Sequence, residues 1–301
     1  MNLKQLAYLA ALHKTHSFTQ AAKQCGVSQS TLSGGIAALE ATLGAALVER
    51  DKQHVLFTPL GQGVVARAAP MLAAGVDLQA YVASGANPLQ GSVVLGAIPS
   101  IAPFLLTALL QKTKAQYPQL TVQLREMQTA PLLAALRDGA LDLGLIALPY
   151  DTAGLAVQPL FQEPLMLIAS AKDALAKIAQ PTLANLVPER LILLEEGHCL
   201  RDHTLQSCTV QERSSAAIEA SSLLTLVQMV NAGLGVALLP EMAVRSPLVQ
   251  PLIDSGSLVA HAFAKPAPQR GVALVARATH TLGAAFDAVA SLSQAARHMP
   301  V

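Results

Sequence analysis

Beyond residue 91, apolar segments of strand length alternate with segments of helical periodicity, and this alternation limits the possible fold more than any other feature of the chain. Strands separated by helices build a doubly wound α/β domain, because each helix crosses one face of a shared sheet. We therefore expect strands over residues 93–98, 120–124, 141–146, 165–169, 191–194 and 236–239, and helices over 101–115, 130–136, 222–231 and 282–296.

The first sixty residues predict a different fold, with three helices followed by a short hairpin. Leucines recur at helical spacing over residues 3–12, and Ser17 and Ser28 stand where the N-caps of the second and third helices are expected. A third helix over 29–42 completes a helix-turn-helix, and residues 48–57 have the pattern of a wing. This segment is thus expected to be a winged helix-turn-helix domain.

Composition and pattern divide the 301 residues into three parts. The winged helix-turn-helix domain is placed at 1–60, a long helical stretch that ends in a linker-like segment at 61–90, and an α/β domain at 91–301. The hydrophobic content of 52% is sufficient for separate cores in these domains. Two long uncharged stretches, 78–111 and 220–240, are interrupted by turn-forming residues, so neither is expected to span a membrane.

The formal net charge is only +1, which excludes a nucleic-acid-binding protein that relies on bulk positive charge. DNA binding therefore has to rest on the helix-turn-helix motif. The start of the chain lacks the basic and apolar pattern of a signal peptide, so a cytoplasmic location is expected. Thiols in that compartment are kept reduced, and a disulfide there is more often a transient redox device than a permanent crosslink.

Two of the three cysteines, Cys199 and Cys208, lie close together in the sequence. In a continuous helix their Cα atoms would be about 13.5 Å apart, whereas a disulfide needs roughly 4.4–6.8 Å, so only a bent segment allows the bond. His198 and Arg201 supply cations that can stabilise a Cys199 thiolate. On this basis a redox switch, a permanent disulfide and two separate buried thiols all remain open. A metal site that also uses His203 is disfavoured, because the spacing fits no common zinc pattern.

Two segments resemble a known family. Residues 18–33, with Thr-Pro-Leu-Gly at 58–61, are similar to the DNA-binding domain of LysR-type transcriptional regulators, and residues 197–208 resemble the redox loop of the peroxide-sensing, OxyR-type members. The resemblance implies a two-lobed, periplasmic-binding-protein-like regulatory domain with crossovers near Pro164 and Pro266. Lobe I would then comprise 91–164 and 267–301, and lobe II would comprise 165–266.

The third helix of such a domain reads base edges in the major groove with its first residues, and the hairpin holds the DNA backbone. Relatives commonly carry Pro at the position of Ser30 and basic residues at those of Ala37 and Ala38, so fewer phosphate contacts are expected here. The expected contacts come from Gln29, Ser30, Thr31 and Ser33 to the bases, and from Arg50 and Lys52 to the backbone.

The same resemblance implies a peroxide site on the regulatory domain. Cys199 is the expected nucleophile, and Cys208 is the resolving thiol that forms a reversible disulfide with it. Arg270 is a weaker candidate for this site. The peroxide-binding residues would be Ser100, Thr129, His198, Arg201 and Asp202, with Ser100 standing where relatives usually have Thr.

The chain is thus expected to be a hydrogen-peroxide-sensing transcriptional regulator, not an enzyme, and to need no cofactor or metal. The family implies promoter DNA, hydrogen peroxide, RNA polymerase and a thiol reductant of the glutaredoxin or thioredoxin type as partners, and a homotetramer built as a dimer of dimers. Two rivals remain. One is a thiol peroxidase that turns over peroxide continuously, and the other is a LysR-type regulator of a small metabolite in which the cysteines are incidental.

Overall fold

The computed structural model describes residues 1–50, 55–83, 89–207, 218–280 and 282–297. The chain folds as two compact units, the first comprising residues 1–86 and the second most of the remainder. The second unit corresponds to the expected regulatory domain and is called the regulatory unit below. None of the helices in the described ranges is long and apolar enough to cross a bilayer.

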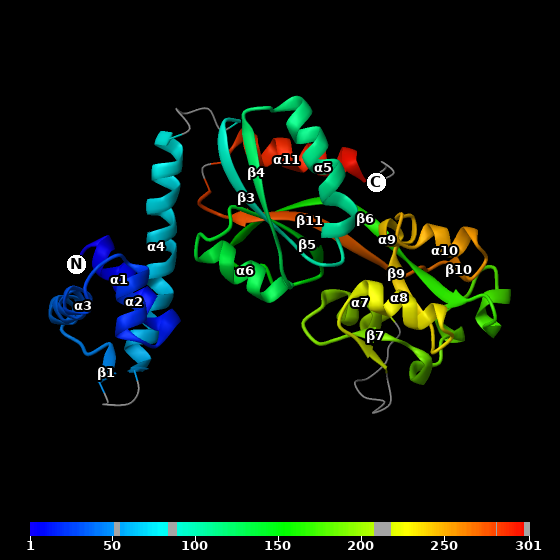
Figure 1. Ribbon diagram of the computed structural model, residues 1–301, viewed down its shortest axis with the longest axis horizontal. Helices are drawn as coiled ribbons and strands as arrows, with labels where there is room; N and C mark the ends of the chain where they lie inside the picture. The colour runs from blue at the N-terminus through cyan, green and yellow to red at the C-terminus, as the bar shows by residue number, and fades with distance from the viewer. Residues whose placement is uncertain (51–54, 84–88, 208–217, 281, 298–301) are drawn as a thin grey trace. The chain divides into compact units, whose positions relative to one another are not determined.

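The first unit begins with three helices, α1 (Leu3–Thr15), α2 (Phe18–Gln24) and α3 (Gln29–Leu43) (Figure 1). Ser17 and Ser28 cap α2 and α3 as predicted, because the side-chain oxygen of each accepts a backbone N–H from the first turn of its helix. The predicted helical stripe in α1 is also present, except that its first leucine is exposed. The buried apolar side chains shared by α1 and α3 include Leu6, Leu9, Leu12, Leu32, Ile36 and Leu39.

The wing and a close contact between α1 and α3 complete the helix-turn-helix part of this unit. β1 (Val48–Arg50) pairs antiparallel with β2 (Val55–Phe57), as predicted for the hairpin. The carboxylate of Glu40 accepts two backbone N–H groups at the start of β1, at 2.8 and 3.1 Å, and so ties the wing to α3. A Cβ added at Gly35 would lie 2.7 Å from a ring carbon of Tyr8, which explains a glycine within α3 despite its helix-weakening effect.

A long helix, α4 (Pro59–Ala83), follows the wing, as predicted for the linker. A Cβ at Gly61 would lie 2.0 Å from the carbonyl oxygen of Leu47, so only glycine fits where the helix begins. Large apolar side chains stay exposed along α4, a feature typical of helices that have a partner surface. They are Leu60, Met71, Val76, Leu78 and Val82.

Three parallel strands form the centre of the first half of the regulatory unit. β3 (Gly91–Ala97) lies between β4 (Leu120–Glu126) and β5 (Leu143–Leu148), and pairs parallel with both. α5 (Ala102–Gln116) and α6 (Thr129–Arg137) follow β3 and β4, which is the strand–helix alternation expected from the sequence. α5 packs against the last described helix, α11 (Ala284–Ala296), over one buried apolar core.

One long strand, β6 (Leu155–Ser170), runs through both halves of the regulatory unit (Figure 1). Its first half pairs antiparallel with β11 (Gln269–Arg277), and its second half pairs antiparallel with β9 (Ala237–Pro240) and β10 (Leu258–Ala262). A second apolar core surrounds this second half. The remaining elements there are β7 (Leu193–Leu194), β8 (Glu219–Ala220), α7 (Cys199–Ser207), α8 (Leu223–Asn231), α9 (Glu241–Val244), α10 (Gln250–Asp254) and 3-10 helices at Ala174–Lys177, Leu183–Asn185 and Pro188–Arg190.

The sequence-based prediction missed β10, β11 and the first half of β6. β6 continues through Pro164, although proline is unusual inside a strand, and β11 begins shortly after Pro266. β11 joins β5 to β6 by antiparallel pairing between segments more than a hundred residues apart. Such pairing between distant segments leaves no local periodicity in the sequence, so the predicted strands include β3, β4, β5 and the second half of β6 but not β10 and β11, which return to pair with them.

Candidate functional site

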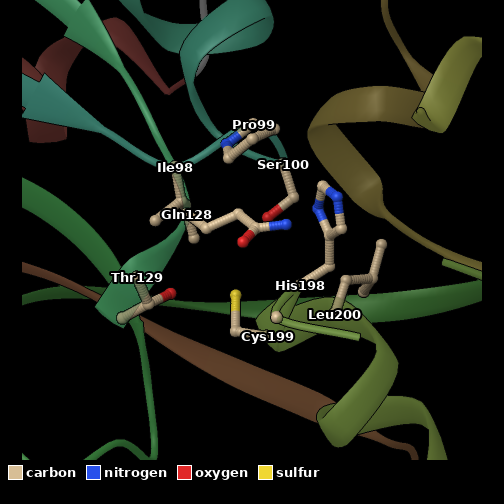
Figure 2. Close-up of a pocket in the computed structure, with 9 residues that line it drawn as sticks. Ile98, Pro99, Ser100, Gln128, Thr129, His198, Cys199 and Leu200 are labelled. Carbon is tan, nitrogen blue, oxygen red and sulfur yellow. The ribbon is translucent and has the colours of Figure 1, made fainter. Parts of the chain in front are cut away.

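The side chain of Cys199 faces the ends of two parallel strands. Ser100 follows β3, and Thr129 begins α6 just after β4, so both lie at the carboxyl edge of the sheet, where ligands bind in doubly wound folds. Cys199 is the first residue of α7, in the other half of the regulatory unit, and its thiol is free. Figure 2 shows the side chains of Ser100, Thr129 and Cys199 around one common space.

Gly197 allows the segment before α7 to approach the first half closely. Its φ of +90° is a conformation that other residues rarely adopt. A Cβ at this position would also lie 2.6 Å from the side-chain oxygen of Gln128. Both features require glycine two residues before Cys199.

The pocket around the thiol is narrow, with about 0 Å³ open to the centre of a water-sized sphere. Ser100, Thr129 and Cys199 are 3%, 1% and 4% exposed. Among the described residues, the Thr129 hydroxyl has no hydrogen-bond partner, and an unpaired buried hydroxyl is a ready contact for a small polar ligand. The lining residues are Ile98, Pro99, Ser100, Gln128, Thr129, Gly197, His198, Cys199 and Leu200.

A buried guanidinium holds the Ser100 side of the pocket. Arg270 Nη1 donates to Ser100 Oγ at 2.7 Å, and Arg270 Nη2 donates to the Ser100 carbonyl at 2.9 Å. On its other side, Arg270 Nε donates to Glu163 Oε2 at 2.9 Å, and both charged side chains are fully buried. Arg270, expected only as a weaker candidate, is therefore a principal cation of this site.

Burial raises the pKa of the Cys199 thiol. The positive charge of Arg270 and then the hydroxyls of Thr129 and Ser100 lower this pKa, and the Asp202 carboxylate raises it, with a net upward result. The reduced site thus favours the protonated thiol. Formation of the reactive thiolate depends on stabilisation by Arg270 and the two hydroxyls.

Of the other three predicted peroxide-binding residues, only His198 lines the pocket. His198 is half-buried and lines the pocket, while Asp202 is exposed. Arg201 points elsewhere, because its Nη1 donates to the Leu194 carbonyl at 2.9 Å and to Glu219 at 2.7 Å. Arg201 was expected beside the thiolate, but residues two apart lie on nearly opposite sides of a helix, so α7 turns it away from Cys199. This corrects its expected position.

His203 is a buried residue of α7 for which only a metal-ligand role was considered. It lies four residues after Cys199 on the same helix face and is 5% exposed. Burial and then the positive charge of Arg270 lower the pKa of His203 to about 4, with the Pro149 backbone acting in the opposite direction. Within the described ranges, neither ring nitrogen makes a hydrogen bond of normal geometry.

The metal alternative has no support in the part of the chain that the structure describes. Those residues contain no group of three or more His, Cys, Asp or Glu arranged to hold a metal ion. Cys208, which that alternative also requires, lies outside the described residues.

The predicted base-reading residues lie at the start of α3. Gln29, Ser30 and Thr31 are exposed, and Ser33 is half-buried. Gln29 Oε1 accepts a hydrogen bond from Thr19 at 3.1 Å, which holds the amide at the N-terminal end of the helix. Lys52 and the side chain of Arg50 lie outside the described part of the chain, so their DNA contacts stay predictions.

Comparison with known proteins covers nearly the whole chain. Residues 3–62 match the family described as bacterial regulatory helix-turn-helix protein, lysR family, and residues 86–297 match the LysR substrate binding domain. The chain is 44% identical to the HTH-type transcriptional regulator EstR of Acinetobacter baylyi, over 96% of this chain and 94% of that protein.

Two solved structures are similar over the same extent. The full-length OxyR C199D variant of Pseudomonas aeruginosa is 34% identical with a TM-score of 0.77, covering 98% of this chain and 95% of that one. A hydrogen-peroxide-bound OxyR variant of Corynebacterium glutamicum is 31% identical with a TM-score of 0.66, covering 98% and 92%. With its helix-turn-helix and two-lobed regulatory units, the chain belongs to the LysR family of bacterial transcriptional regulators.

Proposed function

We propose that this protein is a DNA-binding regulator that senses hydrogen peroxide through Cys199. The observation that carries the proposal is the small buried pocket in which the thiol, the unpaired Thr129 hydroxyl and the Arg270-bound Ser100 hydroxyl meet. A pocket this narrow favours a ligand as small as hydrogen peroxide over a larger effector, and hydroxyls can orient both peroxide oxygens. The similar OxyR variant of Corynebacterium glutamicum is hydrogen-peroxide-bound, which agrees with this ligand.

The proposed chemistry proceeds in two steps. The Cys199 thiolate attacks one peroxide oxygen, the O–O bond breaks, and the product is Cys199 sulfenic acid with a hydroxide that takes a proton to become water. The Cys208 thiolate then attacks the sulfenic sulfur, forming the disulfide and releasing a second water after protonation. Peroxide is reduced by two electrons and the thiol pair is oxidised by two, so a separate thiol reductant must restore the protein.

Helix α7 converts this chemistry into a shape change. Its Cα atoms at Cys199 and Ser207 are roughly 12 Å apart at 1.5 Å per residue, and one more residue shortens that by at most about 3.8 Å. The remaining gap of about 8 Å exceeds the limit of roughly 6.8 Å for a disulfide, so α7 must unwind before the bond closes. Because Cys199 packs in the first core and Leu200 in the second, unwinding disturbs both halves of the regulatory unit.

The other parts of the proposal follow the expectations from the sequence. The domains are 1–60, 61–90 and 91–301, with lobes divided at 164/165 and 266/267, and the exposed apolar row of α4 supports a homo-oligomer, proposed as a tetramer. Promoter DNA is bound through α3 and the wing, and RNA polymerase and a glutaredoxin- or thioredoxin-type reductant are the further partners. The protein acts in the cytoplasm as a regulator and not as an enzyme.

Peptide mass spectrometry after treatment with micromolar peroxide tests the proposal. Wild-type protein should form the Cys199–Cys208 disulfide, Cys199→Ser should lose the peroxide response, and Cys208→Ser should accumulate sulfenic acid or higher oxides at Cys199. Equal inertness of both variants toward a sulfenic-acid probe contradicts the assigned roles. Sustained peroxide consumption with a thiol reductant would indicate a peroxidase instead.

A regulator of a small metabolite is the second candidate, because EstR, whose name mentions no peroxide, is 44% identical to this chain. The size of the pocket argues against a large effector at Cys199, since about 0 Å³ of it is open to the centre of a water-sized sphere, whereas usual small-molecule sites have roughly 300–1,000 Å³. Operator binding by oxidised and reduced protein separates the two candidates. Unchanged binding after disulfide formation favours the metabolite regulator.

A further inference from the structure

Glu163 is a buried carboxylate with no role in the proposed reaction. It is directly opposite Arg270 in the pairing of β6 with β11, and both side chains are fully buried. Its Oε2 accepts from Arg270 Nε at 2.9 Å and lies 2.8 Å from Arg270 Nη2. Its Oε1 accepts the backbone N–H of Met242 at 2.9 Å, at the start of α9. Glu163 is therefore fixed from two directions.

The contacts of Arg270 show what this anchor controls. With one edge of the guanidinium held by Glu163, Nη1 and Nη2 reach the hydroxyl and the carbonyl of Ser100. Because Nη1 already donates to Ser100 Oγ, the hydroxyl hydrogen of Ser100 is free to point away from Arg270 toward another acceptor. Ser100 lines the pocket that contains Cys199, whose sulfur is the acceptor there when it is a thiolate.

We propose that Glu163 is a positioning residue that acts through Arg270 and Ser100 to stabilise the Cys199 thiolate, an inference that rests on the proposed function for its biological meaning. The side chains form a relay from a buried carboxylate, through a guanidinium and a hydroxyl, to the reacting sulfur. Glu163 touches neither the sulfur nor the pocket. Its effect on Cys199 is to keep the cation and the hydroxyl donor in one orientation.

The direction of the effect separates positioning from general support of the fold. Cys199 is buried, so a variant that merely loosens the structure exposes the thiol and speeds its alkylation. A variant that frees Arg270 from its anchor removes stabilisation of the thiolate and slows alkylation, because the thiolate is the reactive form. The two explanations predict opposite signs.

The test is the rate of iodoacetamide alkylation at Cys199 in the reduced full-length chain at pH 8, followed by peptide mass spectrometry. Glu163→Gln keeps the shape and an acceptor oxygen but loses the charge. Its alkylation rate should fall about tenfold, which is the loss of thiolate that corresponds to a rise of one unit in the thiol pKa. Asp142→Asn is the matched control, since Asp142 accepts the Val94 N–H at 2.7 Å and lies 3.7 Å from Arg277, away from the relay. It should stay within about twofold of wild type.

A double-mutant cycle removes the remaining ambiguity. In an Arg270→Met background, which lacks the cation, Glu163→Gln should change the rate no further. An unchanged or faster rate for folded Glu163→Gln, an equal fall for Asp142→Asn, or an additive effect in the Arg270→Met background would overturn the inference. The peroxide reaction of wild-type Cys199, measured separately, decides the proposed function, because alkylation does not depend on peroxide.

Discussion

His203 makes the stability of α7 depend on pH. Burial first, and the charge of Arg270 second, lower the pKa of this side chain to about 4 in the folded protein, from an ordinary value of 6.5. The folded state thus disfavours the proton, and the unwound state accepts it at the ordinary pKa. The stability that His203 contributes is complete above pH 6.5 and is lost as the pH falls from 6.5 toward 4.

The size of this effect follows from the width of the window. The effect is at most about 1.4 kcal/mol per pH unit, and it is smaller near pH 6.5, where half of the unwound state is already protonated. Lowering the pH from 6.5 to 5 should therefore destabilise docked α7 by about 1.6 kcal/mol, which corresponds to an opening equilibrium about 15-fold larger. Hydrogen-exchange mass spectrometry of the α7 peptide in reduced protein measures it, after correction for the intrinsic pH dependence of exchange.

Two variants make the measurement specific. His203→Gln cannot titrate and should show an almost flat opening equilibrium between pH 6.5 and 5. His261→Gln, in which the lost ring faces the Ala176 carbonyl at 3.0 Å, should keep the wild-type dependence. If wild type and His203→Gln open with the same pH dependence, or if NMR shows that His203 titrates near 6.5 in the folded reduced protein, the reasoning is refuted.

Two further predictions concern single contacts. Thr129→Val removes a buried hydroxyl at nearly constant shape. This hydroxyl lowers the pKa of Cys199, so iodoacetamide alkylation should slow by a few fold, and the peroxide reaction, which also loses an oxygen contact, should slow at least tenfold; equal falls in both rates mean that Thr129 acts only through the thiolate or the fold. Gln29→Ala should reduce the preference for the operator over other sequences by about 1–3 kcal/mol. Binding to operator and to scrambled DNA across a salt series measures this preference, and an equal loss of affinity for both DNAs would place base reading elsewhere on α3.

The helix-turn-helix unit was predictable because its determinants are local. Ser17 and Ser28 cap helices within three residues of themselves, and the leucine spacing that predicts α1 also forms its buried face. Gly35, by contrast, only weakens α3 when judged from helix propensity, since nothing in the local sequence indicates that the ring of Tyr8 occupies the space of a side chain there.

The buried Arg270–Glu163 ion pair of the site could not be predicted from local sequence patterns. Arg270 and Glu163 are 107 residues apart, and they meet only because β11 returns between β5 and β6. Arg201, two residues from the cysteine, was the more obvious cation in the sequence. A signal for Arg270 did exist, because it precedes an apolar run from Val272 to Ala276, where a charged residue needs a buried partner.

Helix α7 contains both the cysteine that is oxidised and a histidine whose protonation depends on whether the helix is folded. Cys199 and His203 are both buried on one face of this helix, and both respond to the charge of Arg270. A disulfide requires α7 to unwind, and unwinding releases His203 from the surroundings that keep it neutral. Below pH 6.5, oxidation is therefore coupled to proton uptake by His203, so acid and peroxide favour the same unwound state, whereas reduction and neutral pH favour the helix.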